Sequence, residues 1–535
     1  MEDFQKIKNA NKGDLVSMIK RQQITIDPVL FFGQLTNFGE LQNCILLESA
    51  NTISKYGEKS IGAINPCLKI KGRGENFVIK ALNENGKYFL REIEKDLDFC
   101  DDLVINEEKI SGTLIPNMEM TDERERLKTK THFDILRVIN NKFKPISIEV
   151  NPTGGLFGAI SYDMIDQFEE LPTYKTDIIG DPDYEMIYVD NFFILDHMTN
   201  EIKIVANALI TERSRDDIYI DCIRKINLYQ ECLNECETLD FPDEYKQASH
   251  DIDFITDTEK DTFMKKVEQL KDHITHGDIF QAVLCRTIVA DTQIPRFKAY
   301  KNLREINPGP YMFYFNSSDG CLLGSSPEMF IRVEGDDRKT LEIRPIAGTK
   351  PRGMINGKID PDLDSKYELE LKLDPKEQAE HTMLIDLARN DVARVCEKGS
   401  RFVDEPFIIE KYSHVQHLVS NVSGTLREEF DALHAYIASM NMGTLTGAPK
   451  IEAMKLLRKY ETGKRGYYGG SIGYFTPDGN FDSCIIIRAI RFKNGHAYIK
   501  VGAGIVHDSV PEKEWEETIS KSKACILALT KGVEK

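Results

Sequence analysis

The chain has 535 residues and a mass of 61.1 kDa, several times the size of a typical single domain. It carries 69 basic and 87 acidic residues, a net charge of -18, which opposes binding to the phosphate backbone of nucleic acids. The longest stretch without a charged residue, 432–449, contains a histidine, an asparagine and a proline, and the first residues lack an apolar signal core. We therefore expect a protein that binds neither nucleic acid nor membrane and is not secreted.

The eleven cysteines are scattered, and no C-x-x-C pair occurs. This usage predicts reduced thiols in a cytoplasmic protein rather than disulfides or a zinc site. None of the cysteines lies in a G-x-C-x-G turn, which a glutamine-hydrolysing nucleophile would need. We expect that the chain does not make ammonia from glutamine by itself.

In the N-terminal half, short apolar runs separated by Gly, Pro and Asn predict strands, and a long amphipathic stretch predicts a helix. The predicted strands are 44–49, 146–150, 186–195 and 201–209, and the predicted helix is 211–236. An acidic stretch without apolar periodicity, 235–261, follows and is typical of a surface connection. We place an N-terminal region at 1–240 and a C-terminal region at 258–530.

The C-terminal region begins with a predicted helix at 263–276 and continues with a run of strands. The predicted strands are 279–289, 310–315, 321–324, 328–333, 341–346, 484–492 and 497–506, and the later helices are 375–397, 449–459 and 511–531. Because strands arrive in runs and do not alternate with helices, the pattern favours an α+β fold with antiparallel sheets over a doubly wound sheet.

Two predicted helices begin with the same arrangement of carboxylates. Glu377 and Glu380 are three residues apart in DPKEQAEH, as are Glu514 and Glu517 in SVPEKEWEET, so each pair shares a helix face. Asp374 and Ser509 are the predicted caps, with a glutamate three residues later. For a single pair of this kind, a solvated helix face is the simpler explanation. If the helices face each other, the four carboxylates would repel, and a hard divalent cation such as Mg²⁺ would relieve that repulsion.

The glycine-rich turns do not match nucleotide-binding loops. GTLTGAPK lacks the Ser/Thr that follows the lysine of a Walker loop, and GAG at 502–504 lacks the third glycine of a dinucleotide fingerprint. Such turns can still bring backbone N–H groups close to a small anion. Arg488, inside the apolar run CIIIRAI, predicts either a bound carboxylate or an internal salt bridge.

His417, in YSHVQHLVS, is the histidine best placed for catalysis, with His381 and His414 as rivals. Reasoning from the residues alone thus leads to an acidic α+β enzyme with a Mg²⁺ site and a small carboxylate ligand.

These segments together resemble the chorismate-utilising enzymes, and most closely the large subunits of anthranilate synthases. Eleven motifs occur in the family's order along nearly the whole chain. They are LLES (46–49), GDIFQAVLCR (277–286), NPGPYMFYF (307–315), LLGSSPEMF (322–330), RPIAGTKPRG (344–353), EHTMLIDLARND (380–391), SHVQHLVS (413–420), MNMGTLTGAPK (440–450), YYGGSIGYF (467–475), CIIIRA (484–489) and GAGIVHDSVPEKEWEET (502–518).

The resemblance assigns roles to individual residues. It implies that Glu380 and Glu517 bind Mg²⁺, with Glu377 and Glu514 reaching it directly or through water. His417 would transfer a proton, Thr444 would lie at the reacting face, and Lys521 would add positive charge. The implied chorismate-binding residues are Gly348, Thr349, Tyr468, Arg488, Gly502, Ala503 and Gly504, and the implied tryptophan-binding residues are Ser49, Pro310, Tyr311 and Met312.

Two positions distinguish members of the family. Aminodeoxychorismate synthases have a nucleophilic lysine where this chain has Ala347, and isochorismate and salicylate synthases have a basic lysine where it has Gln281. The absence of both lysines fits ammonia as the nucleophile. Gly309 replaces the family's usual serine beside Pro310, which leaves the strength of tryptophan inhibition open.

The resemblance therefore implies Mg²⁺-dependent conversion of chorismate and ammonia to anthranilate and pyruvate, the first committed step of tryptophan biosynthesis. A separate glutamine amidotransferase subunit would supply ammonia, in a heterotetramer of two large and two small subunits, and tryptophan would inhibit. The alternatives are an aminodeoxyisochorismate synthase, an aminodeoxychorismate synthase component, and a catalytically inactive regulator that binds tryptophan.

Overall fold

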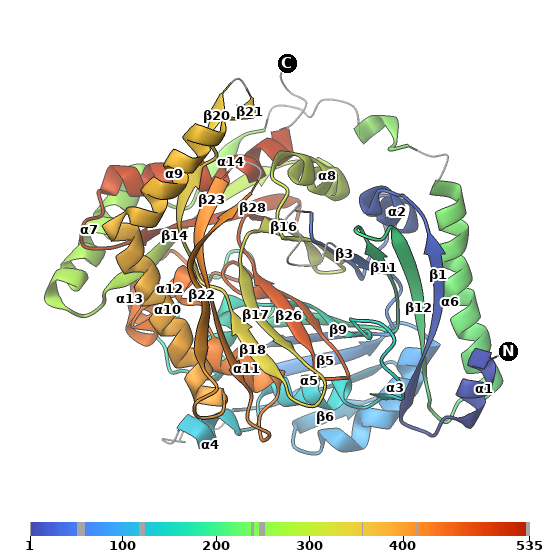
Figure 1. Ribbon diagram of the computed structural model, residues 1–535. Helices are drawn as coiled ribbons and strands as arrows, with labels where there is room; N and C mark the ends of the chain where they lie inside the picture. The colour runs from blue at the N-terminus through green and yellow to red at the C-terminus, as the bar shows by residue number, and fades with distance from the viewer. Residues whose placement is uncertain are drawn as a thin grey trace.

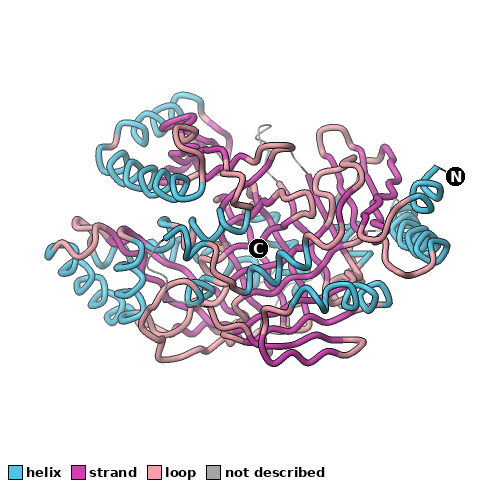
Figure 2. Tube along the Cα trace, turned by 90° about the horizontal axis from the view of Figure 1, so that it is seen from below, coloured by secondary structure: helices cyan, strands magenta, loops and turns pink. Residues whose placement is uncertain are grey.

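The computed structural model describes residues 2–50, 59–116, 123–236, 240–245, 252–355, 357–412 and 415–530. Strands occupy the centre of the molecule and helices its outside, as Figures 1 and 2 show from two directions. The strands form two 13-stranded sheets whose pairs are antiparallel except for β1 with β8. The predicted α+β fold with antiparallel sheets is thus confirmed.

Sheet 1 begins with β13, which lies in the acidic connection, continues with strands of the C-terminal region and ends with strands of the N-terminal region. Its order is β13 (Phe254–Thr256), β14 (Gln281–Asp291), β28 (His496–Ile505), β27 (Ala489–Lys493), β16 (Gly320–Ser326), β15 (Tyr311–Ser317), β2 (Cys44–Glu48), β3 (Lys59–Ala63), β11 (Asn191–Asp196), β12 (Glu201–Leu209), β1 (Asp14–Gln23) and β8 (Lys144–Pro145), with β24 (Gly447–Ala448) paired to β14.

Sheet 2 is divided in the same way. Its order is β19 (Ile346–Pro351), β23 (Val415–Thr425), β18 (Thr340–Ile343), β17 (Met329–Glu334), β26 (Phe481–Ile485), β25 (Ser471–Phe475), β9 (Gly155–Ile160), β10 (Tyr184–Val189), β4 (Leu68–Arg73), β5 (Asn76–Ala81), β7 (Lys109–Thr113) and β6 (Asp101–Ile105), with β22 (Phe402–Lys411) paired to β23. A separate hairpin joins β20 (Met354–Ile355) to β21 (Lys358–Ile359).

Helices cover the outer faces of both sheets. Those on sheet 1 are α1 (Glu2–Asn9), α2 (Pro28–Leu35), α6 (Arg215–Cys236), α7 (Lys260–His276), α8 (Arg296–Ile306), α13 (Lys450–Tyr460) and α14 (Pro511–Thr530). Those on sheet 2 are α3 (Glu84–Ile93), α5 (His132–Asn140), α10 (Pro375–Val395) and α11 (Ala432–Ser439). The others are α4 (Glu123–Leu127), α9 (Pro361–Leu373) and α12 (Gly443–Thr446).

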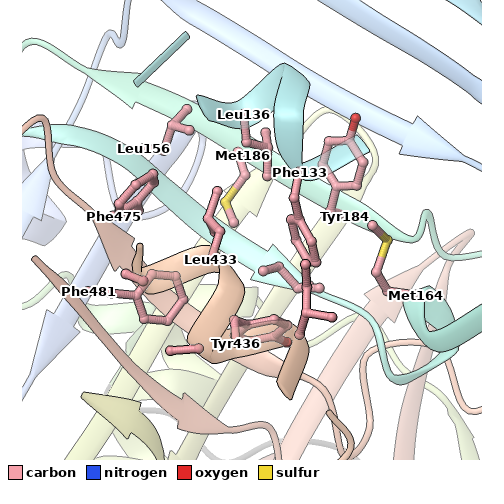
Figure 3. Packing of buried hydrophobic residues seen from close by; sticks show 14 of the residues in the cluster. Phe133, Leu136, Leu156, Met164, Tyr184, Met186, Leu433, Tyr436, Phe475 and Phe481 are labelled. Atoms are coloured by element: carbon pink, nitrogen blue, oxygen red, sulfur yellow. The ribbon is translucent and has the colours of Figure 1, made fainter. Parts of the chain in front are cut away.

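Apolar side chains fill the space between the sheets and under the helices. Between the sheets, Phe313 and Ile61 of sheet 1 belong to the same buried cluster as Phe157 and Ile472 of sheet 2. Under the helices of sheet 2, Phe133 of α5 meets Tyr436 of α11 edge to face, with ring centroids 5.6 Å apart (Figure 3). The two regions therefore share buried clusters, and their boundary at 240/258 stays a prediction.

Several predicted elements differ from those observed. Residues 146–150 form no strand, and the run 186–195 is divided at Asp190 between β10 and β11. The run 484–492 is interrupted at Ile486–Arg488, where Arg488 adopts a left-handed backbone (φ 51°). Asp374 caps α10 as predicted, accepting from the backbone N–H of Lys376. Ser509 is not the residue before α14, which begins at Pro511; its hydroxyl accepts from the backbone N–H of Val506.

Candidate functional site

A cavity of about 520 Å³, called the large cavity, lies where the C-terminal strands of both sheets meet the first turns of α10 and α14. Its size is that of a site for a small organic molecule. Almost all of the predicted catalytic, substrate and metal residues line it. They are Gln281, Gly348, Thr349, Glu377, Glu380, His417, Thr444, Tyr468, Arg488, Gly502, Gly504, Glu514, Glu517 and Lys521. Ala503 is the exception.

The four glutamates near the two helix starts line this one cavity, so the two helices bring their carboxylate faces together. Burial raises the pKa of Glu377, Glu380 and Glu514, and neighbouring carboxylates add to each shift; Glu517 is among the neighbours that act on all three. The set therefore carries more negative charge than its surroundings neutralise. Hard oxygen donors that repel one another are suited to Mg²⁺.

Two lysines partly neutralise these carboxylates. Nζ of Lys521 lies 2.5 Å from Oε1 of Glu517 and 3.0 Å from the carbonyl oxygen of Gly502, and Nζ of Lys376 lies 3.8 Å from Oε1 of Glu380. Among the residues that the structure describes, no three acidic, histidine or cysteine side chains are gathered closely enough to hold a metal ion as they stand. The carboxylates fit Mg²⁺ by donor chemistry, and their side chains would have to turn toward it.

His417 on β23 is held by the neighbouring strand β19, where Thr349 is its register partner. Its Nδ1 lies 3.0 Å from Oγ1 of Thr349 and 3.2 Å from the carbonyl oxygen of Gly348. Because a carbonyl oxygen only accepts, this geometry favours the proton on Nδ1 and leaves Nε2 as the acceptor. Burial lowers the pKa of His417 to about 4, so the ring is neutral at pH 7.

The rival histidines do not share this position. His381 lies inside the fold, where Nε2 is 2.7 Å from Oγ of Ser420 and the ring packs on Phe407, and it does not line the large cavity. His414 lies outside the described residues.

Successive residues of a strand face opposite sides of the sheet, which explains why Gly502 and Gly504 line the cavity and Ala503 does not. On β28, Ala503 is fully buried in a cluster with Phe263 of α7 and Ala453 of α13, on the outer face of sheet 1. Gly502 and Gly504 face the other way. A Cβ on Gly502 would come within 2.9 Å of the Tyr468 hydroxyl, and one on Gly504 within 2.9 Å of Nε2 of Gln281. Only glycine therefore keeps the backbone open to a ligand there.

Arg488 lies between β26 and β27 and lines the cavity. Burial lowers its pKa, while Cys525, Tyr468 and Glu517 act against that shift. In the part of the chain that the structure describes, no carboxylate lies within ion-pair distance of Arg488, so the alternative of an internal salt bridge is not supported. Oε1 of Gln281 is also buried there without a hydrogen-bond partner among the described residues. A ligand with both donors and acceptors would satisfy these groups.

The sequence analysis missed one functional candidate, Glu328, although it lies in the motif SSPEMF. It is buried between β16 and β17 and lines the large cavity. Burial raises its pKa to about 8, against a smaller opposing effect of the Thr444 hydroxyl, so the carboxyl is protonated at neutral pH. The sequence could have indicated Glu328 in the same way as Arg488, since each is a charged residue between two apolar runs.

A second cavity, of about 280 Å³, contains all four residues expected to bind tryptophan: Ser49, Pro310, Tyr311 and Met312. We call it the Ser49 cavity. It also lies between the two sheets, and its polar wall includes Arg332, whose guanidinium is 3.1 Å from the Asp482 carboxylate and 3.1 Å from the Tyr311 hydroxyl. It therefore offers both apolar surface and charged groups, which an amino acid with a large side chain requires.

The described part of the chain contains no helix that is long and apolar enough to cross a membrane.

Comparison with known proteins extends these observations. A family model described as "chorismate binding enzyme" matches residues 105–527. Anthranilate synthase component 1 of Haemophilus influenzae is 40% identical over 520 residues, which cover 95% of this chain and 96% of that protein. The protein of the same name from Salmonella typhimurium is 37% identical over 511 residues, covering 94% of each chain.

Solved structures of related proteins have the same fold. The crystal structure of anthranilate synthase component I from Streptococcus pneumoniae matches with a TM-score of 0.67 at 30% identity and covers 87% of this chain and 92% of that one. The menaquinone-specific isochorismate synthase of Escherichia coli shares the fold with a TM-score of 0.63 at 15% identity, covering 98% of this chain and 97% of that one.

Proposed function

The chain belongs to the chorismate-binding enzymes, and we propose that it converts chorismate and ammonia to anthranilate and pyruvate as the synthase component of an anthranilate synthase. The observation that carries the proposal is the large cavity itself. It brings together residues far apart in the sequence, from Gln281 to Lys521, that the resemblance assigned to this chemistry.

The cavity offers separate positions for the two carboxylates of chorismate. Arg488, Lys521 and the backbone at Gly502 and Gly504 would bind the enolpyruvyl carboxylate. Glu377, Glu380, Glu514 and Glu517 repel an anion, so they would meet the ring carboxylate only with Mg²⁺ between them. When bound, Mg²⁺ would neutralise that carboxylate and stabilise the charge that develops on it.

Two side chains have the protonation states that the reaction needs. When ammonia adds at carbon 2, the hydroxyl at carbon 4 leaves, and protonated Glu328 can supply its proton. Neutral His417, with Nε2 as acceptor, can then take the proton from carbon 2 while pyruvate departs and the ring becomes aromatic.

Ammonia would come from a separate glutamine amidotransferase subunit, in the proposed heterotetramer of two large and two small subunits. Tryptophan would inhibit by binding in the Ser49 cavity. The name "component 1" of the relatives supports the existence of a partner, and a cytoplasmic location fits a biosynthetic enzyme of this kind.

The test is incubation of the whole chain with chorismate, Mg²⁺ and ammonium while anthranilate fluorescence is recorded. Anthranilate with an equal amount of pyruvate supports the proposal. An amino product without pyruvate would indicate an aminodeoxyisochorismate synthase or an aminodeoxychorismate synthase component instead. Tryptophan binding without any turnover would indicate a regulator that has lost catalysis.

A further inference from the structure

The four positively charged side chains that line the large cavity differ in what they contact. Lys376 and Lys521 each lie within ion-pair distance of a glutamate of the proposed metal site. Arg488 and Lys500 have no carboxylate at such a distance in the part of the chain that the structure describes. Their charge therefore stays available to an anionic ligand, on the side of the cavity formed by β28 and the break after β26.

The alternation of β28 directs the side chain of Lys500 into the large cavity. Lys500 and the two glycines Gly502 and Gly504 occupy alternate positions of the strand, so they share one face of the sheet. Both glycines line the cavity, whereas Ala503 between them is buried on the outer face. Lys500 lines the cavity as well and is half-buried. No role has been assigned to it so far.

Lys500 also lies beside the groups expected at the enolpyruvyl carboxylate. Together with Tyr468 it lines both the large cavity and a neighbouring cavity of about 20 Å³, so these two side chains are close to each other. The Tyr468 hydroxyl in turn lies over Gly502 and interacts electrostatically with Arg488. Nζ of Lys500 donates to the carbonyl oxygen of Lys464 at 2.6 Å, which uses one of its three N–H groups.

We propose that Lys500 binds the enolpyruvyl carboxylate of chorismate directly, together with Arg488, and still contacts that carboxylate when pyruvate has formed. This inference rests on the proposed function. A free N–H group of the ammonium would donate a charge-assisted hydrogen bond, which is stronger than a bond between neutral groups. Lys521, which the resemblance places at this carboxylate, is already paired with Glu517, so Lys500 is the better source of positive charge there.

The test measures binding by calorimetry in the presence of Mg²⁺ and without ammonium, so that no turnover is needed. Lys500→Met should raise the Kd for chorismate by roughly 10–100-fold, the loss expected for one hydrogen bond to a charged group. Binding of pyruvate should weaken as well. Anthranilate has the ring carboxylate but no enolpyruvyl group, and it should bind equally well to the variant and to the unaltered protein.

Lys500→Gln separates a contact with the ligand from a role in the fold. Glutamine keeps an N–H donor for the Lys464 carbonyl but has no charge, so it should lose about as much chorismate affinity as Lys500→Met. Chorismate affinity equal to that of the unaltered protein in Lys500→Gln would mean that Lys500 acts only through Lys464. That result would overturn the proposal, also in the case that Lys500→Met does not fold.

Lys271→Met is the matched control. Lys271 on α7 is also half-buried and donates from Nζ to a backbone carbonyl, that of Ser509 at 2.7 Å, but it does not line the large cavity. This variant should bind chorismate normally. An equal loss of anthranilate and chorismate affinity in the Lys500 variants would overturn the proposal. An unaltered chain that binds chorismate but makes no anthranilate with ammonium would count against the proposed function alone.

Discussion

The ring of His417 is held through Nδ1 by Thr349 and Gly348, which leaves Nε2 as the acceptor in the proposed proton transfer. Substituting His417 with Ala should slow pyruvate release by roughly two to four orders of magnitude, and the amino intermediate should accumulate. Since burial holds the pKa of His417 near 4, the base stays neutral as the pH falls from 7 toward 4, and its contribution is lost only below that range.

Rapid-quench analysis of the intermediate and of pyruvate measures this effect. Replacement of the exposed His276 on α7 with Ala is the control and should leave both rates unchanged. An undiminished rate of anthranilate formation in His417→Ala would show that another group takes the proton.

Glu328 should determine the alkaline limb of the pH profile. The carboxyl acts as an acid only while protonated, and its pKa is raised to about 8, so kcat should fall as the pH rises through about 8. Glu328→Gln keeps the shape of the side chain but removes its acidic proton. It should therefore lower kcat by roughly 10²–10⁴-fold and abolish the alkaline limb. A pH–rate profile of both proteins measures this, and an alkaline limb that persists in the variant would contradict the assignment.

At the scale of elements, the first two turns of α10 and α14 bring four carboxylates to one cavity. Glu380→Gln should abolish turnover, because a site that needs charged oxygen ligands loses one of them. The fold should not weaken, since burial and the neighbouring carboxylates of Glu377, Glu517 and Glu514 disfavour the charged form of Glu380, and glutamine removes that charge. The Mg²⁺-induced rise in Tm should disappear together with activity.

Glu512→Gln is the control for this prediction. It removes the same charge from the first turn of α14, at an exposed position that does not line the large cavity. A Glu380→Gln protein that keeps normal turnover at low Mg²⁺ would refute the metal assignment.

The spacing of residues predicted that the two glutamates of each pair share a helix face, because a helix has 3.6 residues per turn. It did not predict the break at Ile486–Arg488. A mainly apolar run such as 484–492 predicts one strand whether or not its backbone turns partway along. The run 146–150 has the composition of a strand but finds no partner in either sheet. Pairing depends on residues distant in the chain, as β2 with β15 shows.

At the scale of the whole molecule, the Ser49 cavity is lined by strands of both regions and the large cavity by the C-terminal region alone, and neighbouring strands connect the two. β15 carries Tyr311 and Met312 of the Ser49 cavity, and its register partner β16 ends at Ser326, two residues before Glu328 of the large cavity. No sequence pattern shows this closeness, because it follows from sheet order. A shift of β15 on ligand binding would thus be felt at Glu328 within one strand.

This arrangement predicts that tryptophan and chorismate antagonise each other. If both ligands bias one two-state equilibrium, saturating chorismate must weaken tryptophan binding by the same factor that tryptophan weakens chorismate binding, typically about 5–150-fold.

Ser49→Arg should abolish inhibition, because its long cation would fill the cavity and repel the ligand's ammonium, while turnover without tryptophan stays near normal. Ser49→Ala, which removes only the hydroxyl, is the matched control and should weaken inhibition far less. Calorimetry on each protein measures tryptophan affinity with and without chorismate, and unchanged tryptophan binding in Ser49→Arg would mean that tryptophan binds elsewhere.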